Sequence, residues 1–328
     1  MKALQVNSLS DDLSGVAISD APVPQPGPGQ VLIRVFSASL NFPDLLMTRG
    51  QYQMKPDMPF TLGGDCSGEV AAVGEGVSRI NVGDRVTGIG VGAFADYCVL
   101  PEATVDPMPS GLSHDEAAAF GAAYLTAYVA LVERARLQPG ETALIHGAAG
   151  GMGLAATDLA RALGAKVIAT GIEDHKLQKV GELYAPSLLI NSRDGFREKV
   201  KEATGGVGAD VIFDPVNGDV FDESVRCINF CGRILVVGFV GNRITSLPTN
   251  LTMIKCFSVV GVRAGEYGRR FPERRRKISE ELKRLAEERA IRPHVHASFA
   301  FDDWRSAFAA MQQQDAIGKV VIRVSDAG

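Results

Sequence analysis

A glycine-rich turn between two apolar runs constrains this chain more than any other feature. Residues 142–145 form an apolar run, the turn HGAAGGMG follows, and an Ala-rich helical stretch at 154–163 leads to a second apolar run at 166–170. This order predicts one βαβ unit, in which glycines let the backbone approach a pyrophosphate and the helix N-terminus offers N–H groups to the anion. Because the glycines stand between a strand and a helix, we expect a dinucleotide site, with Gly150 and Gly153 at the second and third motif positions.

The pattern of apolar runs divides the chain into two kinds of structure. From residue 141 to about residue 262, apolar runs alternate with helical stretches, which predicts a parallel sheet with helices on both faces. The candidate strands are 143–145, 167–169, 188–190, 211–213, 234–237 and 258–262. The first 100 or so residues instead show short apolar runs separated by Gly, Pro and Asp, so we expect strands and turns there. These runs are 31–36, 68–73, 85–88 and 95–100.

Helical signals follow the β-rich start and return near the end of the chain. Ser113 and Glu116 form a capping box, which predicts the start of a helix. A charged helix is expected at 278–290, a short helix near Trp304 and a last strand at 319–324.

The composition excludes several classes of protein. The 328 residues are 46% hydrophobic and 22% charged, with a formal net charge of −4, which gives no general case for binding nucleic acid or an anionic membrane. No run of 18 apolar residues occurs and the first residues lack a signal sequence, so we expect a soluble, unexported protein. Of five scattered cysteines, only Cys227 and Cys231 are close, at a spacing that fits one helix face better than a metal site. We therefore expect reduced thiols and a cytoplasmic location.

The residues after the second strand of the βαβ unit bear on the choice between NADPH and NADH. An NAD-specific site usually has a carboxylate at the end of this strand that binds the ribose 2′-OH. Thr170 and Gly171 stand there instead, so nothing repels a 2′-phosphate. Three basic residues lie within reach in sequence: His175, Lys176 and Arg193. Glu173 points the other way because it can accept the 2′-OH, so we expect NADPH and leave NADH open.

Five segments give the chain a family resemblance that runs almost end to end. They are PGPGQVLIRVFSASLNFPDLLMTRGQY, GGDCSGEVAAVGEGVSRINVGDRV, HGAAGGMGLAATDLARALGAKVIAT, GGVGADVIFDPVNGD and IGKVVI. On these segments the chain resembles the medium-chain dehydrogenase/reductase superfamily, in its zinc-free, zeta-crystallin-like quinone oxidoreductase branch. The resemblance implies an α/β protein with a GroES-like β-rich catalytic domain, made from 1–122 and 263–328, and a Rossmann NAD(P)-binding domain with a doubly wound parallel sheet at 123–262. It also implies a homodimer joined through the edge of the Rossmann sheet, to which we assign ILVVGFVG and FSVVGV.

The chain departs from zinc-dependent relatives at their metal ligands. Those relatives place a Cys in the region of Asn41 and a His-Glu pair after a glycine near position 63, whereas this chain has Gly63, Gly64 and Asp65. Cys66 has no histidine near it in sequence, and a four-Cys structural lobe is missing. Zinc needs three or four N, S or O ligands at suitable spacing. We therefore expect that the chain binds no metal.

The resemblance implies three catalytic residues: Asn41, Tyr52 and Arg263. Asn41 matches the family's asparagine near the nicotinamide, where its amide would orient the ring or an acceptor oxygen; the alternative is a turn asparagine ahead of Pro43. Tyr52 matches a tyrosine of enoyl-thioester reductases that donates a proton or hydrogen bond, and is otherwise a half-buried tyrosine. Arg263 matches an arginine that would offset charge on the reduced acceptor, and is otherwise solvated. Leu46 replaces a second tyrosine found in some quinone oxidoreductases, so one wall of the substrate pocket becomes apolar.

The same match implies the cofactor contacts. They are Asn41, Thr126, Ala149, Gly150, Gly151, Met152, Gly153, Gly171, Lys176, Ser192, Phe239, Val240 and Lys319. Ser192 replaces a tyrosine that many NADPH-using relatives pack on the adenosine phosphate, and Ile172 and Glu173 replace small hydroxyl residues. The 2′-phosphate pocket is therefore weaker than is typical of the family.

Three functions remain open from the sequence. The first is NADPH-dependent reduction of a quinone or an activated carbonyl compound. The second is reduction of enones or enoyl thioesters with Tyr52 as the acid, for which an arginine-rich segment at 269–277 is the only candidate to bind coenzyme A phosphates. A solvated helix start balanced by nearby glutamates is the simpler interpretation of that segment. The third is a nucleotide-dependent sensor or RNA-binding protein, against which the acidic net charge argues.

Overall fold

The strands between residues 142 and 261 form one six-stranded sheet. The computed structural model describes residues 1–241, 243–313 and 315–326. The strand order is β11-β10-β9-β12-β13-β14, and each neighbouring pair is parallel. The strands are β9 (Thr142–Ile145), β10 (Lys166–Gly171), β11 (Leu188–Asn191), β12 (Ala209–Asp214), β13 (Ile228–Val236) and β14 (Ser258–Gly261). All six predicted strands are confirmed. Their carboxyl ends meet at one edge of the sheet, and the order reverses between β9 and β12, where such sheets bind dinucleotides.

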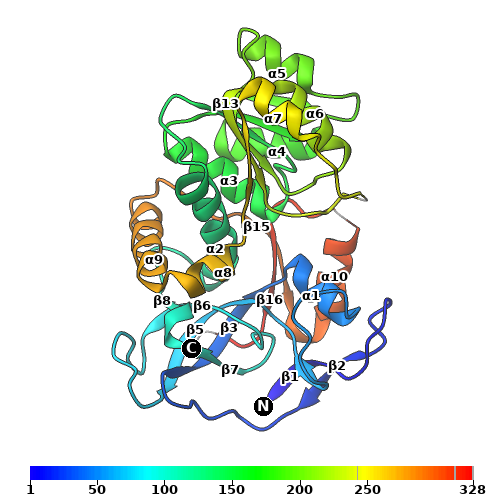
Figure 1. Cartoon of the computed structure of the whole chain (residues 1–328). Helices are drawn as coiled ribbons and strands as arrows, with labels where there is room; N and C mark the ends of the chain where they lie inside the picture. The colour runs from blue at the N-terminus through cyan, green and yellow to red at the C-terminus, as the bar shows by residue number, and fades with distance from the viewer. Residues whose placement is uncertain (242, 314, 327–328) are drawn as a thin grey trace. The chain divides into compact units, whose positions relative to one another are not determined.

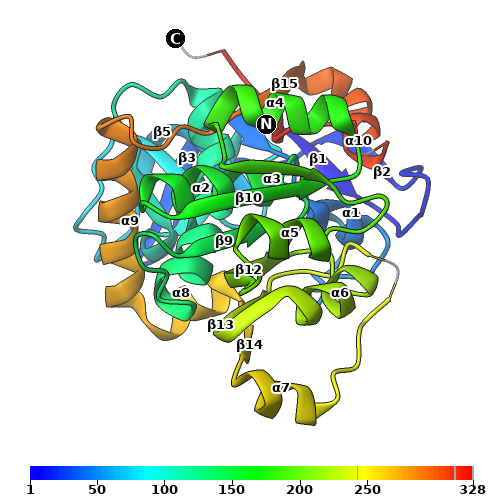
Figure 2. The ribbon, with the colours of Figure 1, turned by 90° about the horizontal axis from the view of Figure 1, so that it is seen from above.

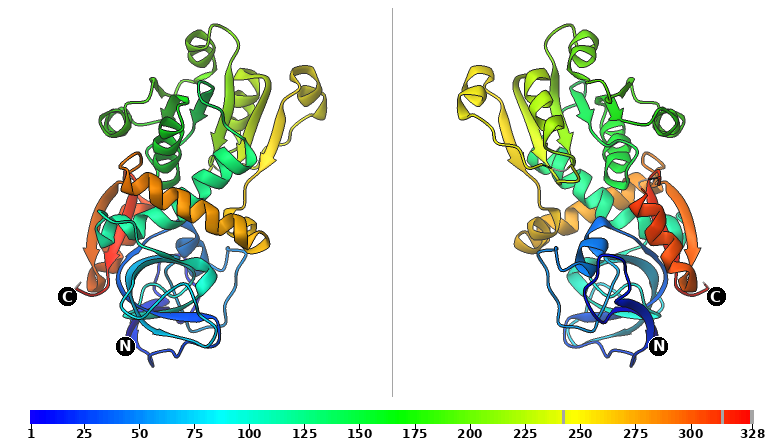
Figure 3. Two further views of the ribbon diagram at one scale, coloured as in Figure 1. Left: turned by 90° about the vertical axis from the view of Figure 1, so that its left-hand side faces the viewer. Right: turned by 90° about the vertical axis from the view of Figure 1, so that its right-hand side faces the viewer.

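Helices cover both faces of this sheet, so the predicted doubly wound α/β fold is confirmed. The helices of this part of the chain are α3 (Gly151–Ala162), α4 (Asp174–Tyr184), α5 (Arg197–Ala203), α6 (Asp219–Cys227), α7 (Thr249–Lys255) and α8 (Ala264–Arg270). Figure 2 shows α3 and α4 on one face of the sheet and α5 and α6 on the other. Figure 3 shows α7, drawn in yellow, beyond the edge strand β14. The helix predicted at 154–163 begins earlier, because Gly150 is already its extended N-cap.

The predicted placement of Cys227 and Cys231 on one helix face is wrong. Helix α6 ends at Cys227, and Cys231 lies within β13, where its φ is +61°. A spacing of four residues brings two side chains to one face only while the helix continues, and here the strand begins at Ile228. The five cysteines are all free thiols.

A second, β-rich body is made from both ends of the chain, which confirms the expected GroES-like domain. One sheet has the order β15-β16-β3-β5-β6-β8, with β7 also paired to β3, and a smaller sheet has the order β2-β1-β4. The strands are β1 (Lys2–Val6), β2 (Val16–Asp20), β3 (Gln30–Ser39), β4 (Phe60–Thr61), β5 (Asp65–Val73), β6 (Arg85–Ile89), β7 (Tyr97–Pro101), β8 (Val105–Pro107), β15 (Val295–Ala300) and β16 (Lys319–Arg323). Strand β16 pairs antiparallel with β3, so the last strand of the chain completes a sheet that the first hundred residues begin.

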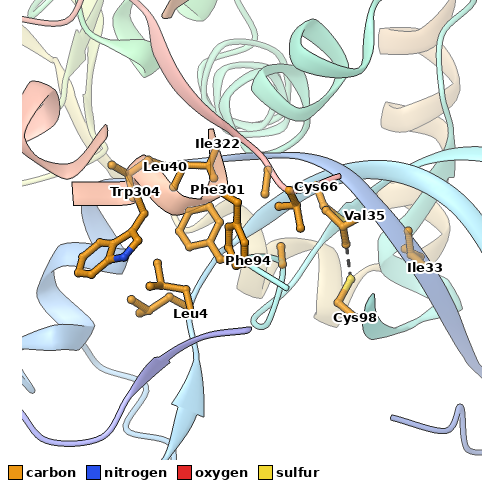
Figure 4. Close-up of a cluster of buried hydrophobic side chains, with 14 of the residues drawn as sticks. Leu4, Ile33, Val35, Leu40, Cys66, Phe94, Cys98, Phe301, Trp304 and Ile322 are labelled. Atoms are coloured by element: carbon orange, nitrogen blue, oxygen red, sulfur yellow. Dashed lines mark hydrogen bonds between the residues drawn. The ribbon is translucent and has the colours of Figure 1, made fainter. Parts of the chain in front are cut away.

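Alternating apolar side chains of these strands form the core of the β-rich body. Figure 4 shows Leu4, Ile33, Phe94 and Trp304 gathered there, and each of them is buried. The remaining elements are α1 (Phe42–Thr48), η1 (Glu102–Thr104), α2 (His114–Tyr128), η2 (Val129–Arg134), α9 (Pro272–Glu287), η3 (Phe301–Asp303) and α10 (Trp304–Gln312). The predicted capping box before α2 is confirmed by hydrogen bonds that join Ser113 and Glu116 in both directions.

The chain divides into two compact units (Figure 1). The first unit contains Met1–Ala122, Ser279–Arg289 and Pro293–Gly328, and the second contains Ala123–Ile278 and Ala290–Arg292. The sequence predicts that 263–278 belong to the catalytic part, but the structure places these residues in the second unit. The reason is a shared partner: Tyr267 and Arg274 both donate to the Glu133 carboxylate of η2, at 2.5 and 3.1 Å. The charged helix predicted at 278–290 accordingly begins at Pro272 and ends at Glu287. Among the described residues, no helix has the length and apolar character needed to cross a membrane.

Candidate functional site

The glycine-rich turn connects β9 to α3 at the carboxyl edge of the parallel sheet. A Cβ on Gly153 would lie 2.1 Å from the carbonyl oxygen of Gly147, whereas one on Gly150 would lie 3.4 Å from the same oxygen. Gly153 therefore lets the first turn of α3 pack directly on the glycine turn. The turn is fixed to the neighbouring strand because the N–H of Ala148 donates to the carbonyl of Thr170 at 2.9 Å. The first N–H groups of a helix have no intrahelical acceptor, so this end of α3 is suited to a pyrophosphate.

A buried histidine holds the beginning of this turn, and sequence reasoning did not identify it. His146 Nε2 lies 2.9 Å from Ser224 Oγ, which itself donates to the carbonyl of Val220. Ser224 must therefore accept from Nε2–H, and Nδ1 must accept from the Thr170 hydroxyl, 2.8 Å away. Burial lowers the pKa of His146 to about 3, so the imidazole is neutral. The neutral ring links the ends of β9 and β10 to α6 of the opposite layer.

The ends of β10 and β11 bring together the residues that gave opposite indications about the cofactor. The Glu173 carboxylate lies 2.8 Å from the Arg193 guanidinium, which also donates to the carbonyl of Ile172 at 3.1 Å. The Ser192 hydroxyl donates to the carbonyl of Gly171 at 3.1 Å. Glu173, whose carboxylate would bind a 2′-OH, and Arg193, whose guanidinium would bind a 2′-phosphate, therefore form one exposed ion pair with each other. Lys176 lies within the first turns of α4.

Other predicted cofactor contacts lie on elements of the same unit. Phe239 and Val240 follow β13 and are each about half exposed, at 52% and 50%. Their segment is held at the end of β12, because the N–H of Val240 donates to the carbonyl of Pro215 at 3.2 Å. Thr126 is half-buried in α2. Thus the turn, the ends of β10 and β11 and the segment after β13 occupy the carboxyl edge of one sheet.

The first unit contains a buried polar cluster around Asn41. The side-chain amide of Asn41 donates to Asp65 at 2.8 Å and to the carbonyl of Ser39 at 3.3 Å. Its oxygen accepts from the Lys319 ammonium at 2.6 Å. Lys319 also donates to the carbonyl of Leu40 at 3.2 Å and lies 3.7 Å from Asp65. Burial lowers the pKa of Lys319. The strands that hold the cluster, β3, β5 and β16, are adjacent in one sheet.

A second carboxyl group supports the backbone on which Asn41 stands. Asn41 is the N-cap of α1, and its N–H donates to Asp44 at 2.8 Å. The other oxygen of Asp44 accepts from the N–H of Gly63 at 3.1 Å. Burial raises the pKa of Asp44 to about 7. Gly63 must be glycine, because its φ is +101° and a Cβ would lie 2.5 Å from the backbone nitrogen of Phe94. Asn41 is therefore both a helix cap and the centre of a buried network, rather than a plain turn residue.

The other two predicted catalytic residues lie in different units. Tyr52 belongs to the first unit with Asn41, is half-buried and packs against the hydrophobic core. Among the described residues, its hydroxyl makes no hydrogen bond. Leu46 is half-buried on α1. Arg263 is the exposed N-cap of α8 in the second unit and follows the carboxyl end of β14.

Sequence reasoning missed Asp44, Asp65 and His146, which are all buried. It also missed Asp214, whose Oδ1 accepts from two backbone N–H groups after β12, each at 2.8 Å. Burial raises the pKa of Asp214. The available signal was a lone charged or imidazole side chain at the end of an apolar run, as in VIFD and LIH.

The arginine-rich segment forms ion pairs within the second unit. Arg269 and Arg270 pair with Glu266, Arg274 pairs with Glu133, and Arg275 is buried. These interactions occupy cations that sequence reasoning considered for coenzyme A or RNA phosphates. Searched over the described residues, the structure contains no group of three or more His, Cys, Asp and Glu side chains that could hold a metal ion.

Known protein families match segments in both units of the chain. Residues 27–110 match the family model described as alcohol dehydrogenase GroES-like domain, and residues 151–285 match the model described as zinc-binding dehydrogenase. The chain is 40% identical over 300 residues to a quinone oxidoreductase-like protein 2 homolog of Nematostella vectensis, an alignment covering 90% of this chain and 82% of the relative.

Two solved structures are similar over nearly their whole length. A mycobacterial protein solved in complex with NADPH has a TM-score of 0.90 at 27% identity, covering 98% of this chain and 100% of that one. The CurK enoyl reductase has a TM-score of 0.89 at 27% identity, covering 98% and 99%.

The fold, the glycine-rich turn and the relatives together show that this protein is an NAD(P)H-dependent oxidoreductase. The chain belongs to the medium-chain dehydrogenase/reductase superfamily, in its quinone oxidoreductase branch, which confirms the resemblance seen in the motifs.

Proposed function

We propose that the protein uses NADPH to reduce quinones or activated carbonyl compounds, without a metal ion. The observation that carries this proposal is the dinucleotide turn in a chain whose 40% identical relative is named as quinone oxidoreductase-like. The NADPH complex of the mycobacterial neighbour supports the choice of cofactor. Bound NADPH supplies a hydride from C4 of the nicotinamide.

The residues present suit the parts of the cofactor that each would hold. The N-terminus of α3, with Ala149, Gly150, Gly151, Met152 and Gly153, would bind the pyrophosphate. Gly171, Lys176 and Ser192 would surround the adenosine ribose, and Arg193 would pair with a 2′-phosphate once it separates from Glu173. Thr126, Phe239, Val240 and Lys319 complete the set of proposed cofactor contacts. Because Glu173 competes for Arg193, we propose that NADH is also accepted.

The catalytic roles are assigned by the chemistry of each side chain. Asn41 would orient the reacting groups through its carboxamide. The Tyr52 hydroxyl makes no hydrogen bond within the described residues. It can therefore donate a hydrogen bond to an oxygen of the substrate, or accept one from the substrate. Arg263 is exposed and would offset negative charge on the reduced acceptor. A quinone needs little more from the protein, because its reduced oxygens take protons readily from water.

A second candidate function is reduction of the carbon–carbon double bond of an enone or enoyl thioester. The observation that favours it is the similarity to the CurK enoyl reductase, together with the hydroxyl of Tyr52 as an acid. Leu46 also makes its side of α1 apolar, which suits an acyl chain as well as a quinone ring.

A panel of electron acceptors separates these two functions. Initial rates of NADPH oxidation would be measured with an ortho-quinone, a para-quinone, an enone and crotonyl-CoA, with NADH in parallel. We expect the quinones to be turned over fastest and NADPH to be preferred. Turnover of only the enone or thioester would replace the first proposal by the second, and silence with all acceptors would contradict both. Activity should survive dialysis against EDTA; activity that is lost and then restored by zinc would contradict the metal-free proposal.

The assembly and location of the protein are further parts of this proposal. We propose a homodimer through the edge of the parallel sheet, because β14 is an edge strand and Met253 and Ile254 of the preceding α7 are 74% and 62% exposed. Sedimentation of the purified protein would test it. A cytoplasmic location remains a prediction from cysteine usage, and no nucleic-acid partner is proposed.

A further inference from the structure

A pocket in the second unit lies apart from the glycine-rich turn. Its volume is about 670 Å³, which falls within the roughly 300–1,000 Å³ of small-molecule sites. Residues of α5, of the segment after α5, of the end of α6, of the start of β13 and of the end of α7 line it, and Figure 1 shows these three helices at one end of the unit. Ile228, at the start of β13, pairs with Ala209, the first residue of β12. The pocket therefore lies at the amino edge of the parallel sheet, opposite the edge that carries the glycine-rich turn.

The lining of this pocket carries a surplus of positive charge. Four cations and one carboxylate, Glu198, give it a formal charge of +3, although the whole chain has a net charge of −4. The cations are Arg197, Lys201, Arg226 and Lys255. We call this place the cationic pocket. A concentration of one sign of charge in a chain of the opposite sign favours a ligand with several negative charges.

Ion pairs within the protein offset little of this charge. Glu198 lies 2.8 Å from Arg197 and 4.0 Å from Lys201. Arg226 is exposed, and its guanidinium makes no ion pair or hydrogen bond within the described part of the chain. Burial lowers the pKa of Lys255, and the charges of Lys201 and Arg226 act in the same direction. These three cations are thus close enough to repel one another, and one carboxylate at the far side of the group does not balance them.

The ends of the neighbouring helices account fully for only one of the four cations. Lys255 donates to the carbonyls of Val225, Arg226 and Ile228, each at 3.2 Å, and so caps the end of α6. Lys201 and Arg226 also stand in last helical turns, but within the described residues neither ammonium nor guanidinium donates to a carbonyl. Arg197 is the first residue of α5, where the helix dipole does not favour a cation. Three cations therefore remain for a ligand.

An irregularity in β13 places an aromatic ring beside these cations. The pairing of β12 with β13 passes from Ala209–Ile228 to Val211–Arg233, so Asp210 alone faces residues 229–232. Such a bulge redirects a side chain. Asn229 holds it in place, because its amide donates to Asp210 at 2.6 Å and its oxygen accepts from the N–H of Phe230 at 2.7 Å.

The redirected side chain is Phe230, which lines the pocket and is 63% exposed. Val207, on the segment after α5, lines the pocket as well and is 60% exposed. Phenylalanine and valine are usually buried, so two exposed members at one charged pocket are informative. Together they offer an apolar surface to a ligand whose other part is anionic.

We propose that the cationic pocket binds an organic polyphosphate that carries an aromatic ring, the chemical class of a nucleoside diphosphate or triphosphate. Arg197, Lys201 and Arg226 would bind the phosphate oxygens, and the planar guanidinium groups match phosphate geometry. Phe230 would pack against the ring. Lys255 would stay on α6 and contribute its charge. Because the pocket and the glycine-rich turn lie at opposite edges of the sheet, this ligand binds in addition to the dinucleotide, and the inference does not depend on the proposed function.

Calorimetric titration with ATP tests the site directly. The protein would first be saturated with NADPH, so that the dinucleotide site is filled, and titrated in a magnesium-free buffer. We expect one ATP to bind per chain at submillimolar concentration. Tripolyphosphate, which lacks the ring, should bind more weakly, and adenosine, which lacks the phosphates, should not bind. Absence of ATP binding at millimolar concentration would overturn the proposal.

A charge reversal in the pocket tests the role of the cations. Arg226→Glu should weaken binding of ATP and of tripolyphosphate about tenfold or more, because a charge-assisted hydrogen bond becomes a repulsion. Lys166→Glu is the matched control: it changes the net charge equally at an exposed position, at the start of β10 on the same edge of the sheet, outside the pocket. It should bind ATP as wild type does. Equal losses in both variants would show only a general attraction to the protein's charge and would overturn the site.

The aromatic ring has a separate test, which also guards against a charge variant that fails to fold. Phe230→Ala should weaken ATP binding about fivefold or more, as the loss of one stacked base implies, and leave tripolyphosphate binding unchanged. Its exposed side chain can be removed without opening the core. An unchanged affinity for ATP would overturn the assignment of an aromatic ligand. Both pocket variants should keep the NADPH affinity and quinone turnover of wild type.

A short single-stranded RNA, titrated under the same conditions, distinguishes a small ligand from a nucleic-acid chain. We expect the RNA to bind no better than ATP, because the pocket is of limited volume and the whole chain is acidic. Much tighter binding of the RNA, lost in Arg226→Glu, would overturn the small-ligand proposal. All these readouts are binding constants, so a protein that fails to reduce quinones would contradict the proposed function and leave this test intact.

Discussion

Replacement of Gly153 by alanine should disrupt the nucleotide site at a single, defined contact. The new Cβ would lie 2.1 Å from the carbonyl oxygen of Gly147, 2.7 Å from its carbonyl carbon and 2.8 Å from Cα of Ala148. Ordinary contacts of this kind begin near 3.4 Å, so α3 and the turn must separate by more than 1 Å. All three atoms belong to the backbone, and no change of side-chain rotamer can relieve the contact.

The expected cost follows from this geometry. Forcing an extra methyl group into a closely packed contact typically destabilises a protein by about 1–3 kcal/mol. The separation also moves the first turn of α3 away from the position proposed to bind the pyrophosphate, so we expect NADPH affinity to fall at least tenfold. Urea unfolding would measure the stability, and isothermal titration calorimetry would measure the affinity.

A matched variant shows whether the loss is specific. Gly265→Ala adds the same methyl group in α8, where no described atom beyond its chain neighbours and the backbone of its own helix lies within 4 Å of the new Cβ, and φ is not positive. It should retain both stability and NADPH affinity. A Gly153→Ala protein that binds NADPH within twofold of wild type and unfolds at the same urea concentration would refute the assignment of the nucleotide site.

Three further predictions address specificity, chemistry and pH. Arg193→Ala should raise KM for NADPH about tenfold and leave KM for NADH unchanged, because only the 2′-phosphate needs the guanidinium. Glu173→Gln should lower KM for NADPH, because Arg193 is then no longer paired with a carboxylate. Parallel changes of KM for both nucleotides would contradict this role of the Glu173–Arg193 pair. Tyr52→Phe should reduce turnover of enones far more than turnover of quinones, since reduced quinones take protons from water, and equal losses would show that Tyr52 only positions the substrate. His146 is neutral in the folded protein down to about pH 3, whereas a histidine in the unfolded chain binds a proton below about pH 6.5. Between these two pH values, His146 therefore lowers the free energy of unfolding by about 1.4 kcal/mol for each unit by which the pH falls. Urea unfolding of His146→Gln between pH 4 and pH 7 should therefore show a weaker pH dependence than wild type, and identical slopes would count against a neutral buried imidazole.

The sequence was most informative where neighbouring residues interact with one another. The turn at 146–153 and the strands around it depend on local periodicity and on glycines whose steric role is visible in the chain itself. The capping box of Ser113 and Glu116 is equally local. Such features could be predicted because their partners lie within a few residues.

The candidate site was less predictable, because its interactions join distant segments. Asn41 is 24 residues from Asp65 and 278 from Lys319, and only the pairing of β3 with β5 and β16 brings the three together. The assignment of 263–278 failed for a similar reason, since Tyr267 and Arg274 share a partner, Glu133, more than 130 residues away. Spacing along the chain carries no information about contacts of this range.

The most direct test of hydride transfer by this protein is the fate of labelled hydrogen at C4 of NADPH. Two NADPH samples, each carrying deuterium on a different face of C4, would be oxidised by the protein with a para-quinone in the absence of oxygen. Mass spectrometry would then measure how much deuterium the NADP⁺ product retains. We expect one NADPH to be consumed per quinone, with deuterium fully lost from one face and fully retained on the other, because a bound nicotinamide presents a single face to the acceptor. Loss of label from both faces, or no oxidation of NADPH by any quinone, would contradict enzyme-bound hydride transfer to a quinone.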